Sequence, residues 1–307
     1  MQIWLAIINP SAGNGSAVKK WEKIKGYLKE KQVSFVPLFI NEAGTTIEKT
    51  KEGIRKGFRR LLVIGGDGTL NEVINAVMSQ SEVPTTEFVI GMMPVGTGND
   101  WCRMHKIPAN DVERVSEIIR AEKMMLHDIG KVVYQTDEGK QERHFINNAG
   151  IGYDAMVVKK ANDQKKQGIS NRFSYFLNVL TVLFSYECYN VHIKIEGEEY
   201  YSKMFSMNVG ICKYKGAGML LVPYAISDDG LLEFTAIRNV SKWKIIMSLN
   251  KLYDGSIVKL PEILSMQSEK IDIDSDQKMP IEVDGEVLGY SPFKFSIFHK
   301  AVWVVVP

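Results

Sequence analysis

Cysteine is scarce in this sequence of 307 residues, and no two thiols stand in CxxC spacing. The three are Cys102, Cys188 and Cys212. A disulfide framework is therefore not expected, and a reducing compartment is the default. The histidines also lack metal-ligand spacing; they are His105, His127, His144, His192 and His299. Ordinary structural roles are expected for them rather than a zinc site.

Long apolar runs are missing as well. Ile3–Ile8 is apolar, but no cationic segment precedes it, so it is typical of a buried strand rather than of a signal peptide. Phe173–Tyr189 is the most membrane-like stretch, and three polar residues, Asn178, Ser185 and Glu187, interrupt it. It falls short of the roughly 18 to 20 apolar residues that span a bilayer. We expect a soluble, cytoplasmic protein.

An excess of charge of either sign is the third absence. Lys and Arg number 38 against 36 Asp and Glu, a formal net charge of +2, whereas nucleic-acid binders usually carry a strong basic excess. No nucleic-acid partner is therefore expected. The apolar share of 45% and the charged share of 24% are typical of globular proteins, and the length suits two domains.

Residues 1–125 alternate between continuous apolar strands and amphipathic helices. The predicted strands are Ile3–Ile8, Val33–Ile40, Leu61–Ile64 and Phe88–Met92. Helices are predicted around Trp21–Leu28, over Thr45–Gly57 and around Leu70–Val77. Apolar strands separated by helices indicate a doubly wound parallel sheet covered on both faces.

The pattern changes near residue 126, and the predicted second domain covers 126–307. Val191–Ile195 and Tyr200–Val209 form a hairpin pattern around Glu196-Gly197. Further short strands are predicted at Phe234–Ile237, Ile271–Ile273, Ile281–Val283, Phe293–Phe298 and Ala301–Val306. Only two helices are predicted here, near Phe173–Tyr186 and Lys242–Tyr253. An antiparallel β-sandwich or barrel is expected.

Three glycine-rich segments stand at the ends of predicted strands: Asn9–Gly15, Gly65–Glu72 and Pro94–Asp100. Glycine lets the backbone approach a ligand, and a following helix N-terminus offers free N–H groups to an anion. Neither GxxxxGK[ST] nor GxGxxG occurs, so a phosphate site would have to be assembled from several loops. The alternative is that these segments are only tight turns, with Asp67 as the N-cap of its own helix.

A second polar motif, Asp284-Gly285-Glu286, lies between two strand-like runs. Asp-Gly is typical of a type I′ hairpin turn, which would present the Glu286 carboxylate at its tip. The alternative is that Asp284 and Glu286 are solvated turn residues.

Gly65–Glu72, which is GGDGTLNE, resembles the signature of the diacylglycerol kinase catalytic family, which includes sphingosine and ceramide kinases and bacterial lipid kinases. Five further elements follow the order of that family. They are Asn9-Pro10 with Gly13, Pro94–Asp100, Gly150–Ala155, Pro223–Leu232, and Asp284–Glu286 with Pro292. Six elements across nearly the whole chain make the resemblance specific, whereas GGDGT alone has counterparts in NAD kinases and phosphofructokinases.

The resemblance implies an ATP site in the first domain and a lipid-substrate domain that supplies the catalytic base. Its implied nucleotide-binding residues are Asn9, Pro10, Gly13, Gly66, Asp67, Gly68, Thr69, Glu72 and Thr97. Glu286 would deprotonate the acceptor hydroxyl. Asp67, Asp100 and Asp229 would belong to a network of carboxylates, water and Mg²⁺. Asp229 and the carbonyl oxygens of Ile226 and Leu231 would hold a structural magnesium ion.

The sequence departs from the family in a few places. A nucleotide-contacting threonine after the second strand has no clear counterpart, and Thr45 or Thr46 are the candidates to replace it. A basic residue of some bacterial members is Asn14 here, with Lys19 or Lys20 as substitutes. Gly216-Ala217-Gly218 stands where the family has three glycines.

The expected function is ATP- and Mg²⁺-dependent phosphorylation of diacylglycerol or a related lipid. One alternative is an NAD-kinase-like activity on a soluble nucleotide. In that family the Asn-Glu pair lies in a separate motif, whereas here Asn71-Glu72 follows GGDGT after a single residue, Leu70. Another is a non-catalytic regulator that binds a nucleotide or a lipid.

A lipid acceptor implies reversible, peripheral membrane association. Two groups of side chains are candidates to meet anionic headgroups: the lysines Lys159, Lys160, Lys165 and Lys166, and the aromatic residues Phe173, Tyr175, Phe176, Phe184 and Tyr186. The alternative is a core helix flanked by a charged loop. An exposed edge strand in the second domain leaves room for a homodimer.

Overall fold

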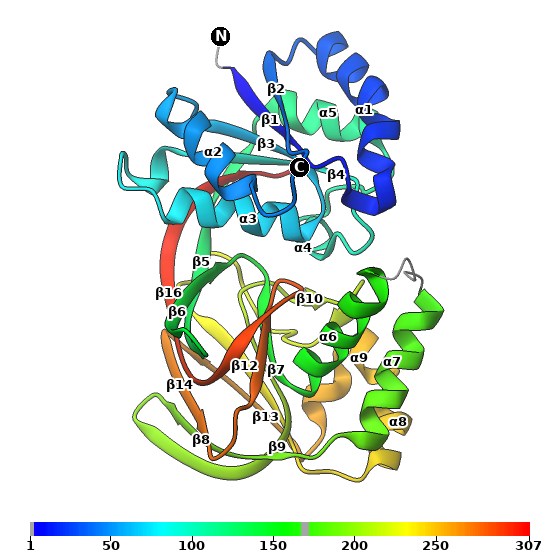
Figure 1. The fold of residues 1–307 in the computed structure, drawn as a ribbon, viewed down its shortest axis with the longest axis vertical. Coiled ribbons are helices and arrows are strands. Elements are labelled where there is room, and N and C mark those ends of the chain that lie inside the picture. The colour runs from blue at the N-terminus through cyan, green and yellow to red at the C-terminus, as the bar shows by residue number, and fades with distance from the viewer. Residues whose placement is uncertain (1–2, 167–171) are drawn as a thin grey trace.

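The computed structural model describes residues 3–166 and 172–307, and its two lobes are stacked along the longest axis (Figure 1). The first lobe is built on a parallel sheet with the order β2-β1-β3-β4-β16. Its first four strands are β1 (Trp4–Ile8), β2 (Phe35–Phe39), β3 (Arg60–Gly65) and β4 (Val89–Pro94). The predicted parallel sheet is confirmed. Strands β1 and β4, and β3 from Leu61 onward, are apolar and buried, as expected for strands covered on both faces.

Helices cover both faces of this sheet. They are α1 (Ala12–Glu30), α2 (Thr46–Arg55), α3 (Asp67–Met78), α4 (Asp100–Met104) and α5 (Val112–Ala121), with a 3₁₀ turn η1 (Thr85–Glu87). Helix α1 packs beside α5, and α2 beside α3, on opposite sides of the strands (Figure 1). No helix was predicted over α5. Its N-terminus is capped by the carboxylate of Asp111, which accepts a 2.9 Å hydrogen bond from Arg114 N.

The second lobe is antiparallel. Its strands are β5 (Met124–Thr136), β6 (Gly139–Phe145), β7 (Asn148–Gly152), β8 (Tyr189–Ile195), β9 (Glu198–Gly210), β12 (Leu232–Arg238), β13 (Ile263–Ser268), β14 (Lys270–Ser275), β15 (Pro280–Val283) and β16 (Glu286–Val305). Two further strands, β10 (Tyr214–Lys215) and β11 (Met219–Leu220), form a separate ribbon. The pairings β16-β15-β7-β9-β8-β14-β16 form a closed circuit around one apolar core.

The predicted hairpin is present between β8 and β9. Ile195 is paired with Glu198, and Glu196 and Gly197 both have positive φ, at 51° and 79°. The alternating residues Val191, Ile193 and Ile195 point into the core. In the main sheet of the second lobe, among the described residues, the edge strands are β6 and β13, each with one neighbour. The homodimer stays a prediction.

Four helices and one 3₁₀ turn accompany these strands. They are α6 (Tyr153–Lys166), α7 (Arg172–Ser185), α8 (Lys242–Ser248), α9 (Lys251–Asp254) and η2 (Ser256–Lys259). The expectation of only two helices is wrong: the lysine-rich stretch is α6 rather than a charged loop, and the second predicted helix is split into α8 and α9. The side chains of Lys165, Lys166, Phe173, Tyr175 and Phe176 lie outside the described residues. No helix in the described ranges has the length and apolar composition needed to cross a bilayer.

Strand β16 belongs to both lobes. The two predicted strands Phe293–Phe298 and Ala301–Val306 are one strand, with an irregularity between Phe298 and Val302 where Lys300 has a φ of 50°. Its early part pairs with β15 and β14, and its last part pairs in parallel with β4, Trp303 opposite Val89. Figure 1 shows β5 and β16 running together between the lobes. The domain boundary at residue 125 stays a prediction, and the return of β16 to the first sheet was not foreseen.

Candidate active site

The two glycine-rich turns after β3 and β4 lie against each other. A Cβ on Gly96 would come within 2.6 Å of Gly66 Cα, closer than real Cβ atoms approach a backbone atom. Val95 N and Gly96 N donate hydrogen bonds of 2.8 and 3.1 Å to Gly65 O. The turns therefore form one backbone surface at the carboxyl ends of the strands, where open α/β sheets bind their ligands.

Asp67 is the first residue of α3, yet its carboxylate caps α4. Oδ2 accepts a hydrogen bond from Asp100 N and Oδ1 one from Trp101 N, both 3.1 Å long. The N-cap of α3 is Gly66, so the alternative interpretation, in which Asp67 caps its own helix, is wrong. Burial, followed by the nearby charge of Asp100, raises the pKa of Asp67 to about 6.

The first glycine-rich loop is connected to α3 through Asn9. Its Nδ2 donates a 3.0 Å hydrogen bond to Thr69 Oγ1, and its Oδ1 accepts hydrogen bonds of 3.1 and 2.7 Å from the N–H and hydroxyl of Ser11. Pro10 and Gly13 are half-buried beside them, whereas Gly68 and Thr97 are exposed. The predicted nucleotide residues thus come from three adjacent loops. The side chain of Asn14 lies outside those described.

The side chain of Asp100, in the first lobe, contacts the second lobe. Its Oδ2 accepts a 2.9 Å hydrogen bond from Ala217 N, and Arg103 Nε lies 3.7 Å from Oδ1. Oδ1 is buried and has no hydrogen-bond partner in the described structure. Burial raises the pKa of Asp100. Ala217, the departure from the family's three glycines, has a φ of 66°, a conformation that favours glycine.

Asp284 is not a solvated turn residue. It and Gly285 have φ values of 47° and 87°, as the predicted type I′ turn requires. The Asp284 carboxylate accepts hydrogen bonds from three successive backbone N–H groups and a side-chain amide. The donors are Ile146 N at 3.0 Å, Asn147 N at 3.2 Å, Asn148 N at 3.0 Å and Asn71 Nδ2 at 2.8 Å. Burial raises its pKa, and the turn is fixed against β7 and α3.

Glu286, directly after this turn, has an exposed side chain that Arg143 holds in place. Arg143 lies on β6, with one terminal nitrogen 2.5 Å from Glu286 Oε2 and its Nε donating a 3.0 Å hydrogen bond to Asn71 Oδ1. Asn71 therefore contacts both Asp284 and Arg143. Burial raises the pKa of the neighbouring Glu72, which bonds to Thr46, one of the candidates for the missing threonine. Helix α3, β6 and the β15–β16 turn thus meet at one point.

Glu282 also holds the Asp284–Gly285 turn in place. This fully buried glutamate accepts a 2.9 Å hydrogen bond from Gly285 N and forms an ion pair with Lys215. Lys215 also donates to Asn208 Oδ1 at 3.2 Å. The backbone that carries Glu286 is therefore fixed from both sides.

Asp229 lies in a separate turn before β12. Its Oδ1 accepts a 3.0 Å hydrogen bond from Leu231 N, and the adjacent Gly230 N donates at 2.7 Å to the buried Asp128. The side chain of Ile226 in the same turn is exposed. In residues 3–166 and 172–307, no hydrogen bond connects Asp229 to Asp67 or Asp100, which are in contact with each other.

Arg143 and the role of Asp284 were not predicted from the sequence. Arg143 shares the polar strand β6 with a second cationic residue, Lys140, and nothing in its local pattern distinguishes it. Asp284 stood inside a motif that was singled out, but its four donors are more than 130 residues away along the chain.

Comparisons with known proteins cover nearly the whole chain. Residues 3–132 match the family model described as the diacylglycerol kinase catalytic domain, and residues 147–306 match the YegS C-terminal NAD kinase beta sandwich-like domain. Proteins named diacylglycerol kinase from Staphylococcus carnosus and Mycobacterium tuberculosis are 26% and 25% identical over 303 residues, 98% of this chain and 94% of each of theirs. A crystal structure titled as a diacylglycerol kinase from Bacillus anthracis has the same fold, with a TM-score of 0.75 at 20% identity, covering 100% of this chain and 97% of that one.

Proposed function

The chain belongs to the diacylglycerol kinase catalytic family with a YegS-type C-terminal domain, and from this premise we propose that it is an ATP-dependent lipid kinase. It transfers the γ-phosphate to a hydroxyl of diacylglycerol or a related lipid. The names of the relatives support this acceptor class. One observation carries the proposal: the exposed carboxylate of Glu286 is held by Arg143 beside α3, the helix that follows the second glycine-rich turn.

The glycine-rich turns are the proposed site for the phosphates of ATP. The close contact of Gly66 with Gly96 leaves no side chain between the backbone and a ligand. Helix α3 begins here, and its free N–H groups and dipole favour an anion. Asn9 and Thr69 hold the first turn next to the second.

Glu286 is the proposed general base. Its Oε2 is bonded to Arg143, so Oε1 is the atom that accepts the proton of the lipid hydroxyl. The hydroxyl oxygen then forms the bond to the γ-phosphorus while the bond to the bridging β–γ oxygen breaks and ADP leaves. The proton passes from Glu286 to solvent. Removal of a base of this kind typically slows a reaction by about 10²- to 10⁴-fold.

Magnesium is the proposed metal cofactor, and the oxygen ligands suit it. Asp100 offers a buried Oδ1 with no hydrogen-bond partner in the described structure, and Asp229 with the carbonyls of Ile226 and Leu231 would hold a structural ion. When bound, Mg²⁺ neutralises negative charge on the phosphates. Asp67 fixes α4 and with it the position of Asp100.

The test is transfer of labelled γ-phosphate from ATP to a panel of lipids in mixed micelles with Mg²⁺. Glu286→Gln is compared with the unmodified chain and with Glu269→Gln, an exposed glutamate between β13 and β14. We expect phosphorylation of at least one lipid, lost in Glu286→Gln only. Phosphorylation of NAD and of no lipid would instead support a nucleotide kinase, and no transfer to either would support a regulator.

Access to a lipid implies a surface that touches the membrane, and we propose that α7 and α8 supply it. The side chains of Phe184, Trp243 and Met247 are exposed there, and Lys242 Nζ bonds to Phe184 O, 2.5 Å away. Exposed apolar and cationic groups together favour anionic interfaces. Trp243→Ser with Met247→Ser is expected to weaken binding to anionic vesicles without changing ATP binding. Unchanged vesicle binding would refute this surface.

A further inference from the structure

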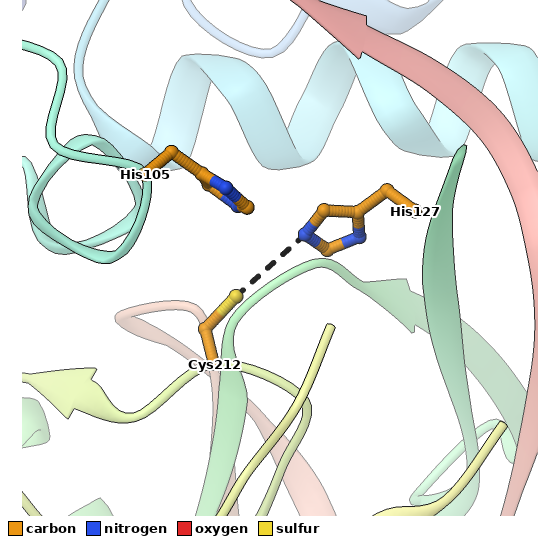
Figure 2. A group of neighbouring side chains, drawn as sticks. All are labelled: His105, His127 and Cys212. Carbon is orange, nitrogen blue, oxygen red and sulfur yellow. Dashed lines mark hydrogen bonds between the residues drawn. The ribbon is translucent and has the colours of Figure 1, made fainter. Parts of the chain in front are cut away.

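Three buried metal-ligand side chains converge between the lobes although they are far apart in the sequence. His105 follows α4, His127 lies on β5, and Cys212 follows β9. One ligand atom from each lies within 4.8 Å of the others. Figure 2 shows the two rings and the thiol facing a common point.

His127 is oriented as a metal ligand would be. Its Nδ1 lies 2.6 Å from the carbonyl oxygen of Asp128, and because a carbonyl can only accept, Nδ1 carries the hydrogen. Nε2 therefore carries the lone pair of the ring. It accepts a hydrogen bond from Trp101 Nε1 and lies 3.7 Å from Cys212 Sγ. A carbonyl partner on the other ring nitrogen is typical of histidines that bind metals.

His105 contributes a buried ring nitrogen that makes no hydrogen bond in the described residues. This atom, Nε2, is shielded from solvent. A buried nitrogen without a partner costs free energy, which a bound ion would recover.

We propose that His105, His127 and Cys212 bind a thiophilic divalent cation of the Zn²⁺ type. Two imidazole nitrogens and one thiolate are borderline-soft ligands that favour Zn²⁺ over Mg²⁺. The 3.7 Å between Sγ and Nε2 is close to the separation of about 3.5 Å in a tetrahedral site with bonds of about 2.3 and 2.0 Å. Water would occupy the fourth position.

Binding changes two existing contacts. Trp101 Nε1 now donates a 3.3 Å hydrogen bond to His127 Nε2, and the ion would replace it. The Cys212 thiol, 3.3 Å from the carbonyl of Ile146, would release its proton to solvent and bind as thiolate.

The ion connects the lobes beside the candidate active site. Helix α4 has Asp100 at its start and His105 just after its end, and the segment from Cys212 leads to Ala217, whose N–H bonds to Asp100. The site therefore holds the contact between Asp100 and the second lobe. It is distinct from the oxygen ligands proposed for Mg²⁺, and it does not depend on the identity of the phosphate acceptor.

The experiment is a titration of the chelator-treated full chain with Co²⁺ and then with Zn²⁺. We expect one Co²⁺ per chain with thiolate-to-cobalt charge-transfer absorption, displacement by Zn²⁺, and a rise in Tm on addition of Zn²⁺. Cys212→Ser abolishes the charge-transfer absorption and weakens Zn²⁺ affinity by at least about tenfold. His105→Leu weakens the affinity in the same way.

Cys188→Ser is the matched control, because its half-buried thiol bonds to Asn239 elsewhere in the second lobe. It retains full binding. The proposal is overturned if the unmodified chain shows neither charge-transfer absorption nor a Zn²⁺-dependent Tm, or if the absorption persists in Cys212→Ser. The measurements on the unmodified chain decide the matter even where a variant does not fold, and none of them uses kinase activity.

Discussion

Asn71 on α3 donates a 2.8 Å hydrogen bond from Nδ2 to Asp284 Oδ2, although the two residues are 213 positions apart in the chain. The same Asn71 accepts from Arg143, which contacts Glu286. Asn71, just after the glycine-rich turn that follows β3, therefore helps to fix the position of Glu286, the proposed base. One short hydrogen-bond network therefore connects the proposed nucleotide loop of the first lobe to the proposed base of the second.

Replacing Asp284 with Asn is expected to destabilise the chain by about 2–4 kcal/mol. The carboxylate accepts four hydrogen bonds, and an amide has one accepting oxygen and brings its own donors toward the backbone N–H groups. Urea denaturation measures the loss. Asp276→Asn, at an exposed position, is the control. A change below 1 kcal/mol in Asp284→Asn would contradict the buried network.

Arg143→Lys is expected to lower kcat by about tenfold to 100-fold while leaving KM for ATP nearly unchanged. Lysine cannot contact Asn71 and Glu286 at once as the guanidinium does, so the proposed base loses its position. The kinetics are measured at saturating lipid, with Arg120→Lys as an exposed control. When Glu286 is already replaced by Gln, Arg143→Lys should lower kcat little further. A further loss of kcat as large as that in the unmodified chain would argue against a positioning role.

Gly96→Ala is expected to cost about 1–3 kcal/mol of stability and to raise KM for ATP. Its Cβ would lie 2.6 Å from Gly66 Cα, so the two turns must separate. Gly68→Ala is the matched stability control, because a Cβ there meets nothing within 4 Å. Thermal unfolding of the two variants side by side checks the prediction, which fails if both unfold at the same temperature.

The pH dependence of stability should reveal Asp67. Its pKa is raised by burial to about 6 in the folded chain, above the unfolded value, so folding favours the protonated form. The associated stability is present below pH 4 and is lost as the pH rises to about 6, by up to about 3 kcal/mol. Asp67→Asn removes this titration. The difference in unfolding free energy between the variant and the unmodified chain should therefore shift in favour of the variant between pH 4 and pH 7. Urea denaturation across that range tests it, and a pH-independent difference would contradict the raised pKa.

The sheet of the first lobe could be predicted because its buried strands are continuous runs of apolar residues in the sequence. Leu61–Ile64 is apolar on both faces, and the structure buries all four residues within β3. Helix α6 could not be predicted in the same way, since its apolar residues lie mainly in its first half, and its second half, from Lys159 to Lys166, has a single apolar residue, Ala161. The two predicted strands at the C-terminal end are one strand because the irregularity at 298–302 bends β16 without ending it.

Site residues were predictable where a motif is local and unpredictable where partners are distant. Glu286 and its type I′ turn follow from three consecutive residues, Asp284-Gly285-Glu286. The role of Asp284 depends on the backbone at 146–148, and that of Arg143 on a side chain of α3. His105, His127 and Cys212 likewise lie on three elements that only the tertiary fold brings together. Spacing along the chain therefore gives no sign of them.

The double membership of β16 has a consequence for biosynthesis. β4 emerges from the ribosome long before Trp303 and Val304, the residues that pair with it. Until they arrive, one edge of the first sheet is unpaired, and the ring of strands in the second lobe is also open. The nascent chain therefore cannot finish its first lobe and release it as a separate folded unit. Both lobes reach their final state in one late step, when this single strand is added. Before that step, the unpaired edge of β4 is exposed to aggregation and is the expected binding site for a chaperone.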